Sequence, residues 1–343
     1  MNSTERRLAL LLWLLLVATS SCATARPRTV APVLLQLAGP VADRRAEVSG
    51  LTWKGDTLAV LPQFPDIFGP EDVLGFFAVS KAEILAAVDD PTGTVVEPRM
   101  IECRSPGLLR IVRGFDGLEA MGIAGDVCYL TAEAKEDTSM AGYLVSGRYQ
   151  FHDGKVTIDL THLSSIPLGL NIPNIAEESL VIDGRRVLTF SEANGRNVNP
   201  EPRAKVFGLD LQYQGSLPFP AIEYRVTDAT ALDADGRFWV MNYFFPPDGG
   251  VLQPAPDPEV ARFGAPEGFD PGGCIERLLE LQLTPEGIVR TDTPPLWLEL
   301  QPDGECRNWE ALVRLDDRGF LIMTDKYPTT LLAFVPFTRE DQP

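Results

Sequence analysis

The sequence predicts an all-β protein that folds as a single β-propeller with four-stranded antiparallel blades. One observation is a motif of two short apolar strands around a turn rich in Gly and Asp, which recurs five times. The other is that the second strand of nearly every copy is apolar on both faces. Such strands are buried on both sides, as in blades that stack face to face around an axis. The copies are Ser49–Gln63, Glu119–Glu133, Glu178–Glu192, Asp228–Asn242 and Glu310–Asp325.

The spacing of the copies bears on the number of blades. The copies begin 70, 59, 50 and 82 residues apart. A four-stranded blade needs roughly 40–50 residues, so the first and the last of these gaps hold surplus residues. We therefore favour six blades over five, with one degenerate copy. Ser80 and Glu83 form a capping box that predicts a short helix over 82–88. Residues 245–273, dense in Pro and Gly, predict a long loop, and 276–283 and 296–300 predict outer strands.

The N-terminus predicts export. Residues 1–21 begin with Arg6 and Arg7, continue with an apolar run and end with small residues. The apolar run is too short to span a bilayer, because a membrane-spanning helix needs about 20 residues. Cys22 follows directly, an arrangement that resembles the signal of bacterial lipoproteins. The alternative is an ordinary signal cleaved after Ala23 or Ala25. We expect a lipid on Cys22, a tether over 22–38, the propeller over 39–338 and a tail over 339–343. The expected location is the periplasmic face of the outer membrane, with the lipid as the only membrane contact.

The formal charge of −18 disfavours nucleic acid and anionic lipid as partners and favours cations. We expect a monomer that binds a small anionic or ester substrate. The cysteines after Cys22 predict two disulfides, Cys103–Cys128 and Cys274–Cys306, because their number is even in an exported chain. The alternative is buried, reduced thiols.

The ends of the motif predict a cation site. Equivalent blade positions form rings, so the polar residue at each end of the motif should lie near one mouth of the central channel. Carboxylates crowded in this way repel one another unless a cation compensates, and Ca²⁺ suits six to eight oxygen ligands. Zn²⁺ is less favoured because the only His residues, His152 and His162, lie outside the motif. The predicted ligands are Glu119, Glu178, Asp228, Glu310 and Asp325. Alternatively, each acidic residue accepts hydrogen bonds from the backbone at a blade corner.

The remaining polar positions suggest a hydrolytic mechanism. A bound metal would polarise a phosphoryl or acyl oxygen and position a water, and Glu133 or Glu192 would be the general base. Asn242 would add a neutral oxygen, and Lys135 and Lys326 would neutralise an anionic substrate. The sequence contains no Gly-x-Ser-x-Gly elbow, Walker loop, dinucleotide fingerprint or His-Glu-x-x-His motif, which disfavours the corresponding enzyme classes.

Three segments carry a family resemblance. Residues 116–120 (Asp-Gly-Leu-Glu-Ala), 308–312 (Asn-Trp-Glu-Ala-Leu) and 330–334 (Thr-Leu-Leu-Ala-Phe) resemble repeats of the phytase-like, "esterase-like activity of phytase" propeller family. The resemblance covers roughly 45–335 and implies an exported propeller, Ca²⁺, and hydrolysis of phosphoesters or carboxyl esters. Ser49 and Asn242 depart from it where acidic residues are expected. A lactonase-type metal hydrolase and a non-catalytic envelope binding protein are the alternatives.

Overall fold

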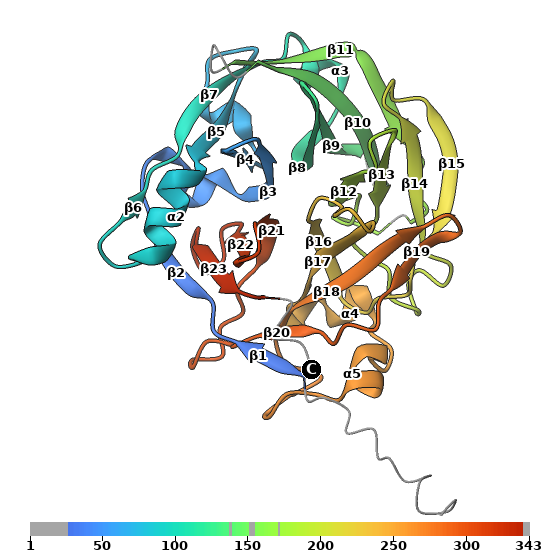
Figure 1. Cartoon of the computed structure of the whole chain (residues 1–343). Helices are drawn as coiled ribbons and strands as arrows, with labels where there is room; N and C mark the ends of the chain where they lie inside the picture. The colour runs from blue at the N-terminus through green and yellow to red at the C-terminus, as the bar shows by residue number, and fades with distance from the viewer. Residues whose placement is uncertain (1–26, 137–138, 151–154, 171, 339–343) are drawn as a thin grey trace, which may run out of the picture.

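The chain is a five-bladed β-propeller, which Figure 1 shows along its central axis. The computed structural model describes residues 27–136, 139–150, 155–170 and 172–338. The predicted signal, Cys22 and the tail over 339–343 lie outside the described residues. In the part that the structure describes, no helix is long and apolar enough to cross a membrane.

Each blade is a four-stranded antiparallel sheet whose first strand lies nearest the axis. Blade 1 consists of β3 (Val48–Lys54), β4 (Thr57–Pro62), β5 (Val73–Ser80) and β7 (Arg99–Arg104), and blade 2 of β8 (Phe115–Ala124), β9 (Val127–Glu136), β10 (Ser139–Gln150) and β11 (Lys155–Ile166). Blade 3 consists of β12 (Ser179–Ile182), β13 (Arg186–Phe190), β14 (Arg203–Gly208) and β15 (Tyr213–Pro218), and blade 4 of β16 (Arg225–Ala229), β17 (Arg237–Phe244), β18 (Ile275–Thr284) and β19 (Gly287–Arg290). Blade 5 consists of β21 (Trp309–Leu315), β22 (Gly319–Thr324), β23 (Leu332–Pro336) and β2 (Val33–Leu37). Blades 1 and 2 are joined at their outer edges, where β7 and β11 pair in parallel.

The ring is closed by the N-terminal segment. Strand β2 pairs antiparallel with β23 and is the outermost strand of blade 5, so both ends of the described chain meet in one sheet. Strand β1 (Arg28–Val30) pairs in parallel with β20 (Leu296–Leu298) of blade 4, and β6 (Val95–Val96) pairs with β2. Strands β1 and β2 lie within residues 28–37, inside the range predicted as a tether. The folded domain therefore begins before residue 39.

The prediction of six blades was wrong, because the surplus residues between copies do not form a sheet of their own. The capping box at Ser80 is present, and it begins α2 (Lys81–Asp89) as predicted. The long loop after β17 holds η6 (Pro246–Asp248), α4 (Gly249–Leu252) and α5 (Pro258–Phe263). The remaining short helices are η2 (Pro40–Ala42), η3 (Arg44–Ala46), η4 (Pro65–Phe68) and α3 (Leu108–Ile111).

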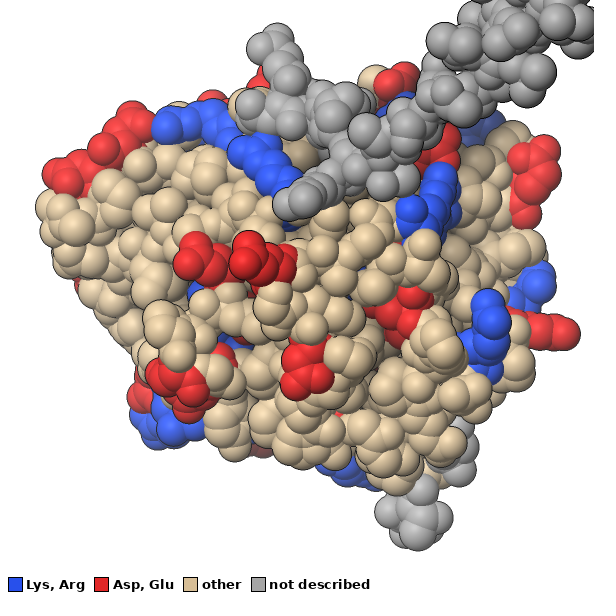
Figure 2. Space-filling view, turned by 90° about the horizontal axis from the view of Figure 1, so that it is seen from below, with Lys and Arg blue, Asp and Glu red and all other residues tan. Residues whose placement is uncertain are grey.

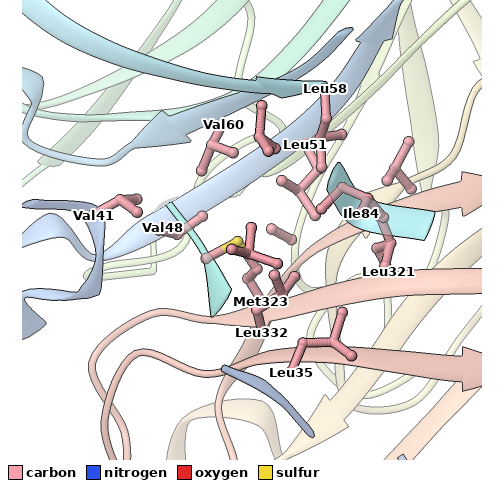
Figure 3. Packing of buried hydrophobic residues seen from close by; sticks show 14 of the residues in the cluster. Leu35, Val41, Val48, Leu51, Leu58, Val60, Ile84, Leu321, Met323 and Leu332 are labelled. Carbon is pink, nitrogen blue, oxygen red and sulfur yellow. The ribbon is translucent and has the colours of Figure 1, made fainter. Parts of the chain in front are cut away.

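Five apolar layers, one between each pair of neighbouring blades, hold the ring together. A sixth buried cluster includes Phe244 of β17 and Leu252 of the long loop. The second strands supply both of their faces to the five layers. In β4, Leu58 and Val60 pack toward blade 5, whereas Ala59 and Leu61 pack toward blade 2. Figure 3 shows the layer between blades 5 and 1, where Leu35 of the closing strand joins side chains of β3, β4 and β22. Apolar residues on both strand faces are therefore what stacks the blades.

Candidate functional site: the central acidic cavity

The innermost hairpins carry a shared irregularity that sets the true register of the repeat. In blades 1, 2, 4 and 5 the first strand has a β-bulge at an equivalent position, which leaves one residue without a partner on the second strand. The first strand of blade 2 has a second bulge at Asp116. In blade 3, Glu178 precedes the first paired residue of β12. A bulge turns a side chain away from its expected face. The residues in this bulge ring are Ser49, Glu119, Glu178, Thr227 and Glu310.

In blade 4 the bulged residue is Thr227, so the prediction that Asp228 belongs to the ring of ligands was wrong. A shift of one residue along a strand moves a side chain to the opposite face. Asp228 is buried, and its carboxylate accepts hydrogen bonds from the backbone N–H groups of Ala229 (2.7 Å) and Leu312 (2.6 Å). Burial raises its pKa well above the ordinary value. Asp228 thus has the structural role considered as the alternative.

The hydroxyl groups in the bulge ring have a structural role too. Ser49 donates to the carbonyl of Leu118 at 2.6 Å, and Thr227 donates to that of Trp309 at 2.7 Å. Each accepting residue directly precedes the bulged Glu of the next blade. The two hydroxyl groups therefore join neighbouring blades where the ring has no carboxylate.

The same shift removes Asn242 from the predicted substrate site. Asn242 is fully buried; its amide donates to the carbonyls of Glu223 (2.9 Å) and Arg225 (2.8 Å) and accepts from Arg277 (2.8 Å). The residue equivalent to Gln63, Glu133 and Asp325 in this blade is Tyr243, which pairs with Arg225 across the hairpin. Asn242 therefore supports the strand that carries Arg225.

The bulge ring and these cross-strand pairs surround a cavity of about 820 Å³ at one mouth of the channel. Glu119, Glu178 and Glu310 line it from the bulges. A longer set lines it from the pairs and nearby turns, namely Glu47, Gln63, Asp116, Glu133, Lys135, Arg225, Tyr243, Asp248, Asn308, Asp325 and Lys326. Of the residues predicted to meet at the channel mouth, Glu119, Glu178, Glu310, Asp325 and Glu133 line this cavity.

Glu119 is held by Gln63 and by the shape of a glycine. The Gln63 amide donates to both carboxylate oxygens, at 3.1 and 3.3 Å. Gly117 has φ +153°, and a Cβ there would come within 2.4 Å of Oε1 of Glu119 and 2.6 Å of Cγ of Gln63. Burial and the neighbouring Glu133 raise the pKa of Glu119 well above its ordinary value. The absence of a Cβ at Gly117 therefore provides the space in which the side chains of Glu119 and Gln63 contact each other.

Glu133 is a buried carboxyl beside an ion-paired one. Lys135 forms an ion pair with Asp116 at 2.5 Å, and the Asp116 carboxylate hydrogen-bonds Glu133. Burial, together with the charges of Glu192 and Asp116, raises the pKa of Glu133 to about 8. At neutral pH, Glu133 therefore carries a proton that it can donate into the cavity.

The third group centres on Arg225. Its guanidinium forms ion pairs with Glu192 and, at 3.0 Å, with Asp248. Glu192 is fully buried behind Arg225 and hydrogen-bonds Glu178, which lines the cavity. Burial raises the pKa of both glutamates, and Arg225 opposes that rise. Glu178 and Glu192 thus repeat the arrangement of Glu133 and Asp116, in which a cavity carboxyl donates to an ion-paired neighbour.

Asn308 links the last two carboxyl groups. Its amide donates to Glu310 at 2.6 Å and also hydrogen-bonds Asp325, which accepts from the backbone N–H of Tyr327 at 2.8 Å. Burial and Asp325 raise the pKa of Glu310 well above its ordinary value. Burial also raises the pKa of Asp325, but its hydrogen-bond donors oppose the rise. Asp325 is therefore the better placed of the two to lose its proton.

Sequence reasoning missed Arg225, Asp116, Asp248 and Asn308. The sequence does contain a signal for Arg225 and Asn308. Both stand two residues before the bulge of their blade, as does Glu47, and all three line the cavity. The corresponding residues in the other blades are small, Gly117 and Ala176. Asp248 comes from the long loop, whose path the sequence does not indicate.

The predicted lysines lie at the cavity, but neither is unpaired. Lys135 is engaged by Asp116, and Lys326 forms an ion pair with Glu47 at 2.5 Å. Their positive charges are therefore already neutralised inside the protein.

The carboxyl groups do not form a ready metal site. Among the described residues, no three Asp, Glu, His or Cys side chains are arranged to hold a metal ion. Glu192 and Asp248 are already engaged by Arg225, so the cation expected from charge repulsion is in part supplied by the chain. Ca²⁺ stays a prediction.

One of the two predicted disulfides is present. Cys274 and Cys306 are joined, and both line the cavity. The prediction of a Cys103–Cys128 disulfide was wrong. Cys103 lies on β7 of blade 1 and Cys128 on β9 of blade 2, where its thiol donates to the carbonyl of Gly147. Both are buried in the layer between these blades.

No family model and no curated protein matches the chain. Solved structures that are similar to it include glycoside hydrolases. One is the catalytic domain of the GH62 α-L-arabinofuranosidase of Coprinopsis cinerea, with a TM-score of 0.49 and 9% identity over 91% of this chain and 97% of that one. Another is a putative glycoside hydrolase of Parabacteroides distasonis, with a TM-score of 0.47 and 10% identity over 93% and 95%. A third, from work on GH130 mannoside phosphorylases and hydrolases, has a TM-score of 0.49 and 7% identity over 95% and 94%. Likeness at this level concerns the fold alone.

Proposed function

We propose that the protein is a hydrolase that cleaves glycosidic bonds by carboxyl acid–base catalysis in the central cavity. The observation that carries this proposal is the chemistry of the lining. Protonated and ionisable carboxyl groups face one volume, and the lysine and arginine side chains that line it are paired with acidic groups. Carboxyl groups whose environments separate their pKa values are the usual source of an acid and a base.

The charge of the transition state favours glycosides over esters. Glycoside hydrolysis passes through an oxocarbenium-like state with developing positive charge, which nearby carboxylates stabilise. Ester and phosphoester hydrolysis develops negative charge, which needs N–H donors, cations or a metal. An acidic lining opposes such a state, so the ester substrates predicted from the sequence are less favoured without a bound cation.

Glu133 and Asp325 are the best candidates for the two catalytic roles. Glu133, protonated at neutral pH, gives its proton to the leaving-group oxygen as the glycosidic bond breaks. Asp325 takes a proton from the water whose oxygen forms the new bond to the anomeric carbon. The products are two hydroxyl compounds, and the proton on Asp325 returns to Glu133 through solvent. Glu192, predicted as a base, lies behind Arg225 and is a positioning residue in this mechanism.

The test is a comparison of leaving groups. Glu133→Gln should lower kcat/KM on alkyl or sugar leaving groups by about 10²–10⁴-fold, the usual contribution of a general acid, and much less on dinitrophenyl glycosides, which leave without a proton. Asp325→Asn should lower both. Exposed Glu286 provides the matched control, Glu286→Gln, which should retain full activity. If Glu133→Gln loses activity equally on both substrate types, Glu133 is not the acid.

Ca²⁺-dependent ester hydrolysis is the second candidate. The raised pKa values of Glu119, Glu178 and Glu310 favour it, because a divalent ion would relieve their repulsion. When bound, the ion would supply the positive charge that an ester transition state needs. Calcium titration by calorimetry, with Glu119→Gln/Glu310→Gln as the comparison, tests the site. Hydrolysis of p-nitrophenyl phosphate, p-nitrophenyl acetate or a lactone that needs Ca²⁺ would favour this candidate, and ligand binding without any turnover would favour a binding protein.

We also propose that the protein is exported and carries a lipid on Cys22. The support is the sequence of residues 1–22. In a bacterial host, we expect radioactive palmitate to label the wild type and not Cys22→Ser. A label-free, fully soluble wild type would contradict it.

A further inference from the structure

The charges that line the cavity are strongly unbalanced. Among the described residues, nine acidic and three basic side chains line it. Each basic side chain forms an ion pair with an acidic one: Lys135 with Asp116, Arg225 with Asp248, and Lys326 with Glu47. Six acidic side chains have no ion-pair partner among the described residues, namely Glu119, Glu133, Glu178, Glu305, Glu310 and Asp325. On the face that Figure 2 shows, basic and acidic side chains are mixed.

Two buried carboxyl groups at the cavity, Glu133 and Glu119, have no cationic partner among the described residues. The side chain of Glu133 is only 4% exposed and lines the cavity, and its hydrogen-bonding neighbour among the described residues is another carboxyl, that of Asp116. Glu119, also 4% exposed, accepts hydrogen bonds from the amide of Gln63 and has no ion-pair partner in the part of the chain that the structure describes. Buried carboxyl groups are costly unless a cation or donors satisfy them. A ligand that enters the cavity can supply the missing donors.

The size and the mouth of the cavity argue for an organic ligand. About 820 Å³ lies within the range of small-molecule sites and far exceeds the space of one metal ion. Phe245 and Tyr327 line the mouth and are 43% and 52% exposed, and Phe64 lines it as well. Aromatic faces attract both sugar rings and organic cations.

We propose that the substrate is a glycoside of an amino sugar, whose protonated amino groups bind the unpaired cavity carboxyl groups that take no part in the acid–base step, namely Glu119, Glu178, Glu305 and Glu310. This inference rests on the proposed glycosidase function and names its substrate class. An ammonium group presents three N–H donors and a positive charge. Its charge lowers the raised pKa of a neighbouring carboxyl group, which then loses its proton and forms the ion pair. The N-acetyl form of the same sugar has a single N–H donor and no charge, and would leave the carboxyl groups uncompensated.

Glucosamine and N-acetylglucosamine oligomers of equal length provide a matched pair of probes. On the mature wild-type chain near pH 6 and low salt, we expect the glucosamine tetramer to bind at least about tenfold more tightly in calorimetry, because ion pairs form in a partly desolvated cavity. Raising the salt to about 1 M should reduce this preference by shortening the Debye length. Glu305 lies at the exposed rim, and Glu305→Gln should weaken the binding of the charged oligomer and leave the binding of the acetylated oligomer unchanged.

The outcomes separate this inference from the proposed function. Equal or tighter binding of the acetylated oligomer, or a preference that salt does not change, would overturn the substrate class. Cleavage of the acetylated oligomer alone would also overturn it and leave the glycosidase function standing. Tight binding of the charged oligomer without cleavage would support the recognition of amino groups and contradict the hydrolase. Displacement of the charged oligomer by micromolar Ca²⁺ would instead assign the carboxylates to a metal.

Discussion

At the scale of single residues, the cavity depends on charges placed behind its surface. Arg225 is only 15% exposed in its side chain and Glu192 is fully buried. Breaking such a pair leaves an uncompensated buried charge, which typically costs about 3–5 kcal/mol. Arg225→Met should therefore lower the free energy of unfolding by that amount, and Arg225→Met/Glu192→Gln should recover most of it. Urea denaturation measures both variants, and a double variant as unstable as the single one would contradict the pairing.

Gly117 tests how closely Glu119 and Gln63 must approach. Gly117→Ala should displace both side chains and cost about 1–3 kcal/mol through the strained backbone and the close contact. Gly55→Ala is the matched control, because Gly55 has a positive φ of 58° with no atom within 4 Å of the added Cβ. Thermal unfolding and glycoside turnover should both fall further in Gly117→Ala than in Gly55→Ala. Equal effects would mean that backbone strain alone matters.

At the scale of strands and hairpins, the repeat predicts the blades but not their register. Apolar residues on both faces of the second strands revealed the stacking, because burial on two sides leaves that pattern. Blade 4 shows the limit. Asp228 and Asn242 are spaced fourteen apart, like the ends of three other copies, yet the equivalent pair is Thr227 and Tyr243. A bulge leaves no sequence signal of its own, and a slip of one residue reverses every side chain.

The closing strand β2 illustrates a second limit, because its partner lies at the other end of the chain. Its five residues follow the expected lipid site and have no copy of the motif, so they resemble a tether in sequence. Their strand character comes from the free edge of β23, which needs a partner and a cover for the apolar layer. Only the folded ring supplies that edge.

Removal of this strand tests the closure. A chain that starts at residue 38 loses β1, β2 and the buried Leu35, whose side chain alone is worth about 2–5 kcal/mol. At roughly 2–4 °C per kcal/mol for a domain of this class, we expect the melting temperature to fall by about 10 °C or more. A chain that starts at residue 27 keeps every described strand and should melt like the full mature protein. Equal melting of the two truncations would mean that β2 does not close the ring.

At the scale of the whole molecule, the buried carboxyl groups of the cavity change how stability depends on pH. Most acidic proteins lose stability as pH falls, because paired carboxylates become protonated. Here burial raises the pKa of several cavity carboxyl groups instead, among them Glu119, Glu178 and Glu310. The folded protein therefore holds protons that the unfolded chain releases. Under the proposed recognition of amino sugars, a positively charged ligand would offset this cost.

Glu133 allows a direct test of this pH dependence. Its pKa is about 8 in the folded protein against the ordinary value of 4.5. Between these pH values the folded state binds more protons than the unfolded state, so the free energy of unfolding falls as pH rises, by up to about 1.4 kcal/mol per pH unit for one group. We expect urea denaturation to show this decline from pH 5 to 8, and Glu133→Gln to make it shallower. Activity should follow the same proton, with kcat/KM of the wild type falling above about pH 8 because the general acid is then ionised. A free energy of unfolding that increases from pH 5 to 8, with the same slope in Glu133→Gln, would show that Glu133 is ionised throughout and does not donate the proton.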